Sequence, residues 1–319
     1  MTYLDLYIQI DKYLESKLFF QVVEMKIFDY FHHSTTKEKV AQEMKISIKR
    51  LEPLLRVLIK LGWVEKDNEK LINNEKVDKF LYSKSSYYIG EILIIKKELL
   101  DFEHIGNLLN GEESKSKRIY DFDRMLDVGA KEIEYFRVDT LIKEAAQLFE
   151  SESVKSILDL GGGSGLFALE LALLYPEAQV RLFDRRSVLD RAKSYIKKRV
   201  PLDRLDYQEG DFISDDFGKD YDLIIASGII DFAYNDVKAF LRKLKDGIAS
   251  NGYIFLYSAS LLKDDALINR ELRWLSGRLR SNLVTVSKEE IEHGLEDAGL
   301  EVVKKTEDLL YPIWILRRI

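Results

Sequence analysis

Three glycines spaced G-x-G-x-G lie where an apolar stretch gives way to a helical pattern. Residues 157–165 read ILDLGGGSG, so Gly161, Gly163 and Gly165 follow a predicted strand and precede a predicted helix over 166–175. A backbone free of side chains can turn sharply there and lie against a ligand, beside N–H groups that have no partner within the helix. The chemistry indicated is nucleotide-like binding by backbone groups.

Two carboxylates follow the glycines at the ends of the next predicted strands. Asp184 ends a strand over 179–183, about 20 residues on, where a ribose diol needs a hydrogen-bond acceptor. Asp211 and Phe212 follow a strand predicted near 205–208. No Lys-Ser/Thr pair follows the glycines, so the phosphate-binding P-loop pattern fails. The spacing also lacks the extra residue of the dinucleotide motif G-x-G-x-x-G.

The elements that must position these groups alternate along the second half of the chain. After the glycine turn, helices are predicted over 187–199, 236–248 and 287–298, and strands over 222–226, 253–257, 300–304 and 313–318. Such alternation predicts an α/β fold, a Rossmann-like doubly wound and mostly parallel sheet covered on both faces, and the last two strands suggest an antiparallel hairpin. Ligands of such sheets bind outside the carboxyl ends of the strands, so we expect an acceptor over residues 227–234.

The first part of the chain predicts a separate helical domain. Apolar residues recur at helical spacing over 4–31, and two interpretations stay open: a helix pair that covers a core, or a dimer surface. From residue 34 the pattern predicts helix, turn, helix and two short strands with Asp67-Asn68 at the tip, which is a winged helix. The polar loop over 112–117 is the predicted boundary, which gives an N-terminal domain over 1–112 and a second domain over 118–319.

A DNA-binding role for the winged helix is the least favoured interpretation. A DNA reader needs a net positive face, whereas acids balance bases across this segment and the whole chain carries a net charge of −6. The predicted recognition helix over 48–61 sets Glu52 against four basic residues, Lys49, Arg50, Arg56 and Lys60. We therefore expect no nucleic-acid partner.

These segments resemble a known family over nearly the full length. The winged helix, a connector with EHIGNLLNG, FDRM at 122–125, LDLGGGSG, GDF and the closing EEIEHGLEDAGLEVVK are similar to class I S-adenosylmethionine-dependent small-molecule O-methyltransferases with an N-terminal winged-helix dimerisation domain. The resemblance implies a homodimer whose N-terminal domains interlock and close one wall of the acceptor pocket. It implies that the glycine loop holds the methionine part of S-adenosylmethionine, Asp184 the ribose, and Asp211 with Phe212 the adenine. The cofactor-binding set so implied is Gly161, Gly163, Asp184, Asp211, Phe212 and, nearby, Ser227.

The catalytic histidine of that family has no counterpart here. In the family it stands in an H-D-W type motif after the fourth strand, supported by two glutamates, whereas this chain reads ASGIIDFAYND. Aligning from the preceding strand puts Asp231 at that position, and aligning from the later Asn-Gly turn puts Ile230 there. We prefer Asp231, because the strand end fixes the register over a shorter distance. Ser258 and Thr285 stand where the glutamates would.

Asp231 is accordingly the predicted base or acceptor anchor, and a capping or solvent-facing role stays the alternative. The ordinary pKa of an aspartate, near 3.9, makes it a weak base unless burial raises it, although an acidic phenol or enol acceptor needs little help. The resemblance also places three residues, His104, Met125 and Trp274, on segments beside the acceptor, where packing or core roles are the alternatives. We interpret His32 and His33 as surface residues.

The chain is thus predicted to be an S-adenosylmethionine-dependent methyltransferase that acts on a small aromatic or polyketide-like molecule, with oxygen favoured over carbon or nitrogen. The rival is an enzyme of the same scaffold that binds S-adenosylmethionine without donating its methyl and steers a cyclisation, hydroxylation or decarboxylation.

Cysteine is absent and the histidines form no set with acids, so we expect no metal. No apolar run approaches the roughly 20 residues of a membrane helix, and the acidic N-terminus differs from a signal peptide, so we expect a cytoplasmic protein without a membrane partner.

Overall fold

The chain forms two compact units, Met1–Glu98 and Leu99–Ile319. The computed structural model describes residues 2–100, 105–110, 122–150, 153–197, 204–262, 271–273, 275, 278–279, 286–306 and 311–319. The boundary loop predicted over 112–117 lies outside these residues. Within them, no helix is both long and apolar enough to cross a lipid bilayer.

The N-terminal unit contains the predicted helices and hairpin. Its elements are α1 (Tyr3–Glu24), η1 (Ile27–Phe31), α2 (Lys37–Glu43), α3 (Ile48–Lys60), β1 (Val64–Asp67), β2 (Lys70–Asn73), α4 (Glu75–Leu81) and α5 (Gly90–Leu100), which reaches the unit boundary. Helix α1 begins with a capping box between Thr2 and Asp5. Strands β1 and β2 pair antiparallel about Asn68, whose φ of 54° suits an asparagine in a tight turn. Their apolar side chains pack with those of η1, α2 and α3 in one buried cluster.

His32, predicted as a surface residue, is partly exposed, with 30% of its side chain accessible, and it also contacts residues at the end of α4. Its ring stacks on Tyr82 with centroids 3.8 Å apart, and its Nδ1 lies 3.0 Å from Asp78 Oδ1. Asn73 donates from Nδ2 to the same Asp78 oxygen and to the Phe28 carbonyl. The sequence alone did not predict these contacts of His32, because Asp78 and Tyr82 are about 50 residues away and approach His32 only in the tertiary fold.

The C-terminal unit is built on one seven-stranded sheet of order β5-β4-β3-β6-β7-β9-β8. Strands β3 to β7 are parallel, and β9 pairs antiparallel with both β7 and β8, so the predicted closing hairpin is present. The strands are β3 (Ser156–Leu160), β4 (Gln179–Asp184), β5 (Leu205–Glu209), β6 (Tyr221–Ser227), β7 (Ile248–Tyr257), β8 (Leu300–Lys305) and β9 (Ile313–Arg318). The helices and 3-10 turns are α6 (Ile105–Leu109), α7 (Phe122–Phe136), α8 (Val138–Leu148), α9 (Leu166–Leu174), α10 (Arg186–Lys197), η2 (Ile230–Ala233), α11 (Val237–Gly247), η3 (Ala259–Leu261) and α13 (Lys288–Ala298).

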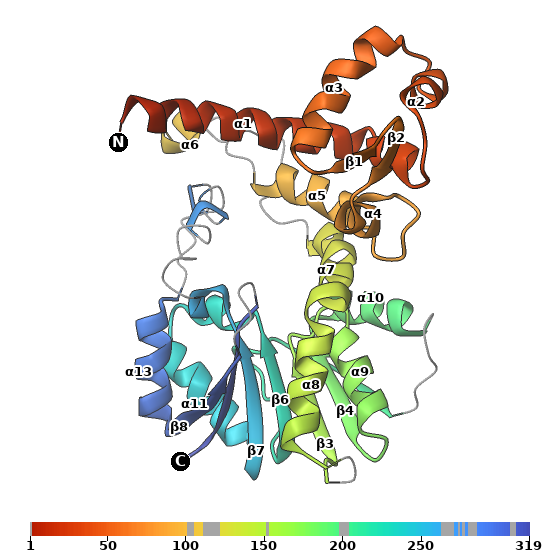
Figure 1. Ribbon diagram of the computed structural model, residues 1–319. Coiled ribbons are helices and arrows are strands. Elements are labelled where there is room, and N and C mark those ends of the chain that lie inside the picture. Colours follow the sequence, from red (N-terminus) through yellow and green to blue (C-terminus); the bar gives the residue numbers. More distant parts are fainter. Residues whose placement is uncertain are drawn as a thin grey trace. The chain divides into compact units, whose positions relative to one another are not determined.

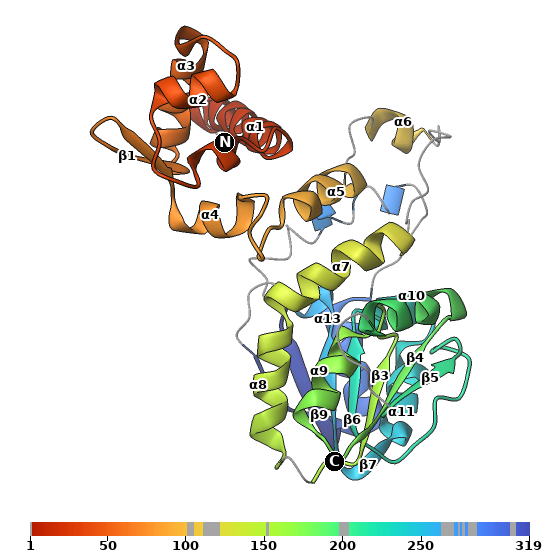
Figure 2. The ribbon, with the colours of Figure 1, turned by 90° about the vertical axis from the view of Figure 1, so that its right-hand side faces the viewer.

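Helices cover both faces of this sheet (Figures 1 and 2). Side chains of α8, α9 and α10 pack with one set of strand residues, including Ile157 of β3 and Ile225 of β6. Side chains of α11 and α13 pack with the alternate set, including Leu158 and Leu160 of β3. Burial on both faces explains why the central strands read as continuous apolar runs. The carboxyl ends of β3, β4, β5, β6 and β7 therefore meet along one edge of the sheet, which bears the candidate site.

Candidate active site

The glycine turn after β3 is packed too closely for a side chain. Gly161 has φ 63°, in the left-handed region, and its N–H donates to the Phe183 carbonyl at 2.8 Å. A Cβ built on Gly161 would lie 2.5 Å from Ile229 Cγ2 and 3.4 Å from the Phe212 ring. Gly163, with φ 56°, turns its N–H onto the Asp184 carboxylate. The turn therefore needs glycine for conformation and for space, and it lies directly against the loops that follow β5 and β6.

Asp184 ends β4 and is bonded to the glycine turn. Its Oδ2 accepts from Gly163 N–H at 3.0 Å, and its Oδ1 accepts from Arg185 N–H at 2.7 Å. Burial raises the pKa of this carboxyl, while these two N–H groups oppose the rise. The carboxylate is thus held in place by backbone donors at the predicted ribose position.

Phe212 adjoins Gly161 after β5, and Asp211 shapes the turn that presents it. Asp211 is exposed; its Oδ1 accepts from Ile213 N–H at 2.8 Å. The Phe212 ring meets Phe232 and Phe240 edge to face, with centroids 6.3 and 6.2 Å apart. The structure therefore brings the aromatic ring of Phe212 beside the glycine turn.

Asp159 is a candidate that the sequence reasoning missed. It lies on β3 among apolar residues and faces α9, where its Oδ2 accepts from Ala168 N–H at 3.1 Å. The side chain is 1% exposed, and its Oδ1 has no hydrogen-bond partner within the described structure. Burial raises the pKa of this carboxyl to about 7; the Ala168 N–H lowers it, Asp184 raises it, and Arg137 lowers it. An acid inside the apolar run ILDLG was the available signal.

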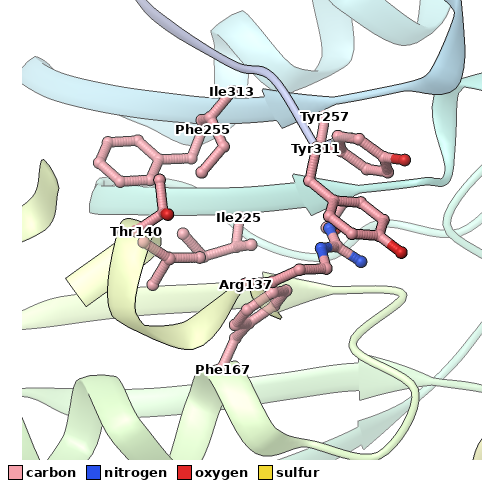
Figure 3. Close-up of a pocket in the computed structure, with 10 residues that line it drawn as sticks. Arg137, Thr140, Phe167, Ile225, Phe255, Tyr257, Tyr311 and Ile313 are labelled. Carbon is pink, nitrogen blue, oxygen red and sulfur yellow. The ribbon is translucent and has the colours of Figure 1, made fainter. Parts of the chain in front are cut away.

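Arg137 was also missed, and it lies among aromatic rings at the carboxyl end of the sheet (Figure 3). It separates α7 from α8, and its guanidinium carbon lies 4.3, 5.0 and 5.2 Å from the ring centroids of Tyr257, Tyr311 and Phe167. Its Nη2 donates to Ser227 Oγ at the end of β6. These residues line a cavity of about 10 Å³, roughly the space of one water. Burial raises the pKa of the Tyr257 phenol to about 12, and Arg137 opposes that rise.

Asp231, on η2 after β6, is held by two serines that follow β7. Ser258 Oγ donates to Asp231 Oδ2 at 2.9 Å, and Ser260 Oγ lies 3.1 Å from Asp231 Oδ1. Both serines are fully buried, whereas Asp231 is half-buried. The carboxylate is therefore held by buried hydroxyls and remains partly exposed.

The side chains of the three predicted acceptor-side residues are not among those that the structure describes. His104 and Trp274 lie outside the described residues, as does Thr285. Met125 is part of α7, and its side chain falls outside the described part. In the part of the chain that the structure describes, no group of three or more histidines and acids is placed to hold a metal ion.

Asp159 predicts a specific pH dependence of stability. Between about pH 4 and pH 7 the folded chain keeps a proton that the unfolded chain releases, so by linkage the free energy of unfolding falls as pH rises through this window. Asp159→Asn removes that dependence and leaves only a constant offset. In urea unfolding, we expect the free energy of unfolding of the variant, taken relative to that of the native chain, to rise by about 2 to 3 kcal/mol between pH 5 and pH 8. A difference that stays constant with pH would contradict the protonated buried carboxyl.

Comparison with known proteins identifies the class. The O-methyltransferase domain model matches residues 114–273, which is half of the chain. The protein is thus an S-adenosylmethionine-dependent methyltransferase, and it belongs to the O-methyltransferase family that this model defines. The structure of human N-acetylserotonin methyltransferase in complex with S-adenosylmethionine shares the fold, with a TM-score of 0.72 and 19% identity over 99% of this chain and 97% of that one.

Two relatives are similar in sequence. N,N-dimethyltransferase OxyT of Streptomyces rimosus is 23% identical over 307 residues, which cover 91% of this chain and 88% of OxyT. An uncharacterized protein of Methanocaldococcus jannaschii is 24% identical over 225 residues, 67% of this chain, and the match spans 60% of that protein's length.

Proposed function

We propose that the chain transfers a methyl group from S-adenosylmethionine to an oxygen of a small aromatic or polyketide-like acceptor. The observation that carries this proposal is the convergence of the glycine turn, Asp184, Phe212 and Ser227 with Asp231 along one edge of the sheet. The family membership supports the reaction type, and it makes the rival without methyl transfer the less favoured reading. Relatives named for O- and for N-methylation leave nitrogen as the second acceptor atom to test.

The residues of this edge fit S-adenosylmethionine. Gly161 presents no side chain and has no room for one beside Ile229 and Phe212, and the buried Asp159 Oδ1 has hydrogen-bonding capacity left over. In our proposal Asp184 accepts from the ribose hydroxyls, Phe212 covers the adenine beside Asp211, and Arg137 binds the methionine carboxylate. The cofactor supplies an electrophilic methyl on a sulfonium. The chain's own task is then to hold the acceptor oxygen in line with that methyl, which supplies much of the rate.

Asp231 takes the acceptor proton in this proposal. It stands after β6, next to Ser227, where the acceptor is expected over the carboxyl ends of the strands. The Tyr257 phenol is nearby, since Asp231 contributes to raising its pKa. A carboxylate at this position serves an acceptor hydroxyl that is already acidic, such as a phenol or enol.

We further propose that two copies of the chain pair through α1. The first half of α1 exposes a continuous set of large apolar side chains, between 37% and 75% accessible: Tyr3, Leu4, Leu6, Tyr7, Ile8, Ile10, Tyr13 and Leu14. A face of this kind is costly to leave in water and is typical of an interface.

The pairing predicts a change of mass on substitution. In the native chain we expect light scattering to give twice the 37.2 kDa chain mass, and in the double variant Leu6→Glu, Ile10→Glu to give the chain mass itself. The two positions are four apart and share one side of the helix, so the charges would enter the interface together. Leu173→Glu, at an exposed apolar residue of α9, is the matched control and should stay paired. A double variant that stays paired would place the interface elsewhere.

The experiment that tests the function is label transfer. Purified protein is incubated with methyl-labelled S-adenosylmethionine and panels of phenols, enols and amines, and S-adenosylhomocysteine and labelled products are followed by mass spectrometry. Label on an oxygen supports the proposal, and label on a nitrogen selects the second acceptor atom. Cofactor binding without any transfer, while a panel compound changes, would favour the rival that does not methylate.

A further inference from the structure

The two serines around Asp231 differ in what their single protons can do. Ser258 Oγ accepts from Ser260 N–H at 3.0 Å, so its proton is available for Asp231 Oδ2, to which it donates at 2.9 Å. Ser260 Oγ has two acceptors within reach: the Val286 carbonyl oxygen at 2.5 Å and Asp231 Oδ1 at 3.1 Å. A hydroxyl has one proton to donate and two lone pairs that accept.

Counting protons decides the direction of the second contact. The Val286 contact is the shorter, so the Ser260 proton belongs to that carbonyl. The contact between Ser260 Oγ and Asp231 Oδ1 then needs a proton from the carboxyl side. When Asp231 is protonated, the chain of donors runs from Asp231 to Ser260 to Val286, and each oxygen is satisfied.

We infer that Ser258 and Ser260 are opposed positioning residues for Asp231: Ser258 stabilises its ionised form, and Ser260 accepts the hydrogen bond of its protonated form. The inference rests on the proposed function and adds how the carboxyl works as a base without an imidazole. During transfer the acceptor hydroxyl gives its proton to Asp231 while a lone pair of its oxygen bonds to the methyl carbon. The electron pair of the broken carbon–sulfur bond stays on sulfur, and Ser260 receives the hydrogen bond of the new carboxylic acid.

Other charged groups share this corner of the sheet. The Tyr257 phenol of β7 feels four of them: Glu132 of α7 and Asp231 raise its pKa, and Arg137 and Arg273 lower it. Helix α11, which packs on η2, has its Lys238 and Arg242 in ion pairs with Asp297 of α13. The serine variants leave all of these groups in place, so a shift that depends on which serine is removed reports the serine itself.

The test is a titration of Asp231 that needs no acceptor. Carbonyl resonances are followed by NMR in protein labelled with 13C at the aspartate carboxyl, and the Asp231 signal is the one lost in Asp231→Asn. Ser260→Ala removes the acceptor of the acid form and should move the titration midpoint about one pH unit down; Ser258→Ala removes a donor to the carboxylate and should move it about one unit up. Midpoints that move in the same direction, or not at all, would overturn the assignment.

Controls separate this result from damage to the fold. Ser260→Thr keeps the hydroxyl and should restore the native midpoint, and Ser260→Cys, a weak acceptor of similar size, should give a smaller downward shift if Ser260→Ala does not fold. Ser214→Ala removes a hydroxyl from the exposed carboxylate of Asp215 and should leave the Asp231 midpoint unchanged. Opposite shifts without any label transfer would support the roles of the two serines and contradict the methylation proposal. Label transfer without opposite shifts would support methylation and contradict the roles of the serines.

Discussion

Replacing Asp231 with asparagine should lower turnover by about 100-fold to 10,000-fold, the range that a positioned base contributes. Asparagine keeps the shape of the side chain and can still accept from Ser258 Oγ, but it cannot take a proton from the acceptor. Affinity for S-adenosylhomocysteine should stay within about twofold of native, because Asp184 and the glycine turn are untouched. The turnover is measured as the initial rate with the acceptor found by label transfer. The affinity is measured by calorimetric titration of S-adenosylhomocysteine into each protein.

The matched control is Asp190→Asn, at an exposed aspartate of α10 beside Arg186. This variant should match the native chain in both rate and affinity. If Asp231→Asn keeps native turnover, the base role is removed, and Asp231 is left as an acceptor anchor that would show in KM alone.

The sequence predicted the parts of the site whose signal is local. The turn at Gly161 and Gly163 follows its strand directly, Asp184 ends β4, and Phe212 follows β5 after two residues, so period and spacing were sufficient to place them. The parallel order of the strands then followed from the alternation of strands and helices. The antiparallel hairpin of the last two strands was also predicted, whereas the place of β9 between β7 and β8 was not.

What the sequence could not predict depends on contacts between distant segments. Arg137 stands in a helical connector without a motif, and its partners Ser227, Tyr257 and Tyr311 are 90 or more residues away. Ser258 was noticed only as a missing glutamate, because its bond to Asp231 exists only once η2 and the end of β7 are side by side.

Asp159 is the intermediate case between local and distant signals. One acid in the strand ILDLG was visible, but whether it faced solvent or an apolar helix depended on which face of β3 the helix α9 covers. Strand periodicity alone therefore does not tell whether an acid on a strand that leads into a glycine turn is buried or exposed.

Replacing Arg137 with methionine should weaken S-adenosylhomocysteine binding by about 30-fold to 150-fold, as expected for loss of a charge-assisted hydrogen bond of about 2 to 3 kcal/mol. The guanidinium is confined by the rings of Tyr257, Tyr311 and Phe167, so little side-chain entropy opposes its use in binding. Methionine keeps an unbranched apolar stem of the kind that arginine has and removes the guanidinium charge. Arg317→Met, at an exposed arginine paired with Glu301, is the control and should bind as the native chain does.

A second ligand tells whether Arg137 binds the methionine carboxylate or only supports the pocket. Methylthioadenosine keeps the adenine, ribose and sulfur of the cofactor but lacks the amino-acid part. If Arg137 contacts the carboxylate, Arg137→Met should bind methylthioadenosine as tightly as the native chain, and the whole loss should appear with S-adenosylhomocysteine. This pair of ligands and variants forms a cycle that isolates the interaction from general weakening of the site. Equal losses for both ligands would show that the arginine acts through Ser227 and the aromatic rings, by holding the ends of β6 and β7 in place.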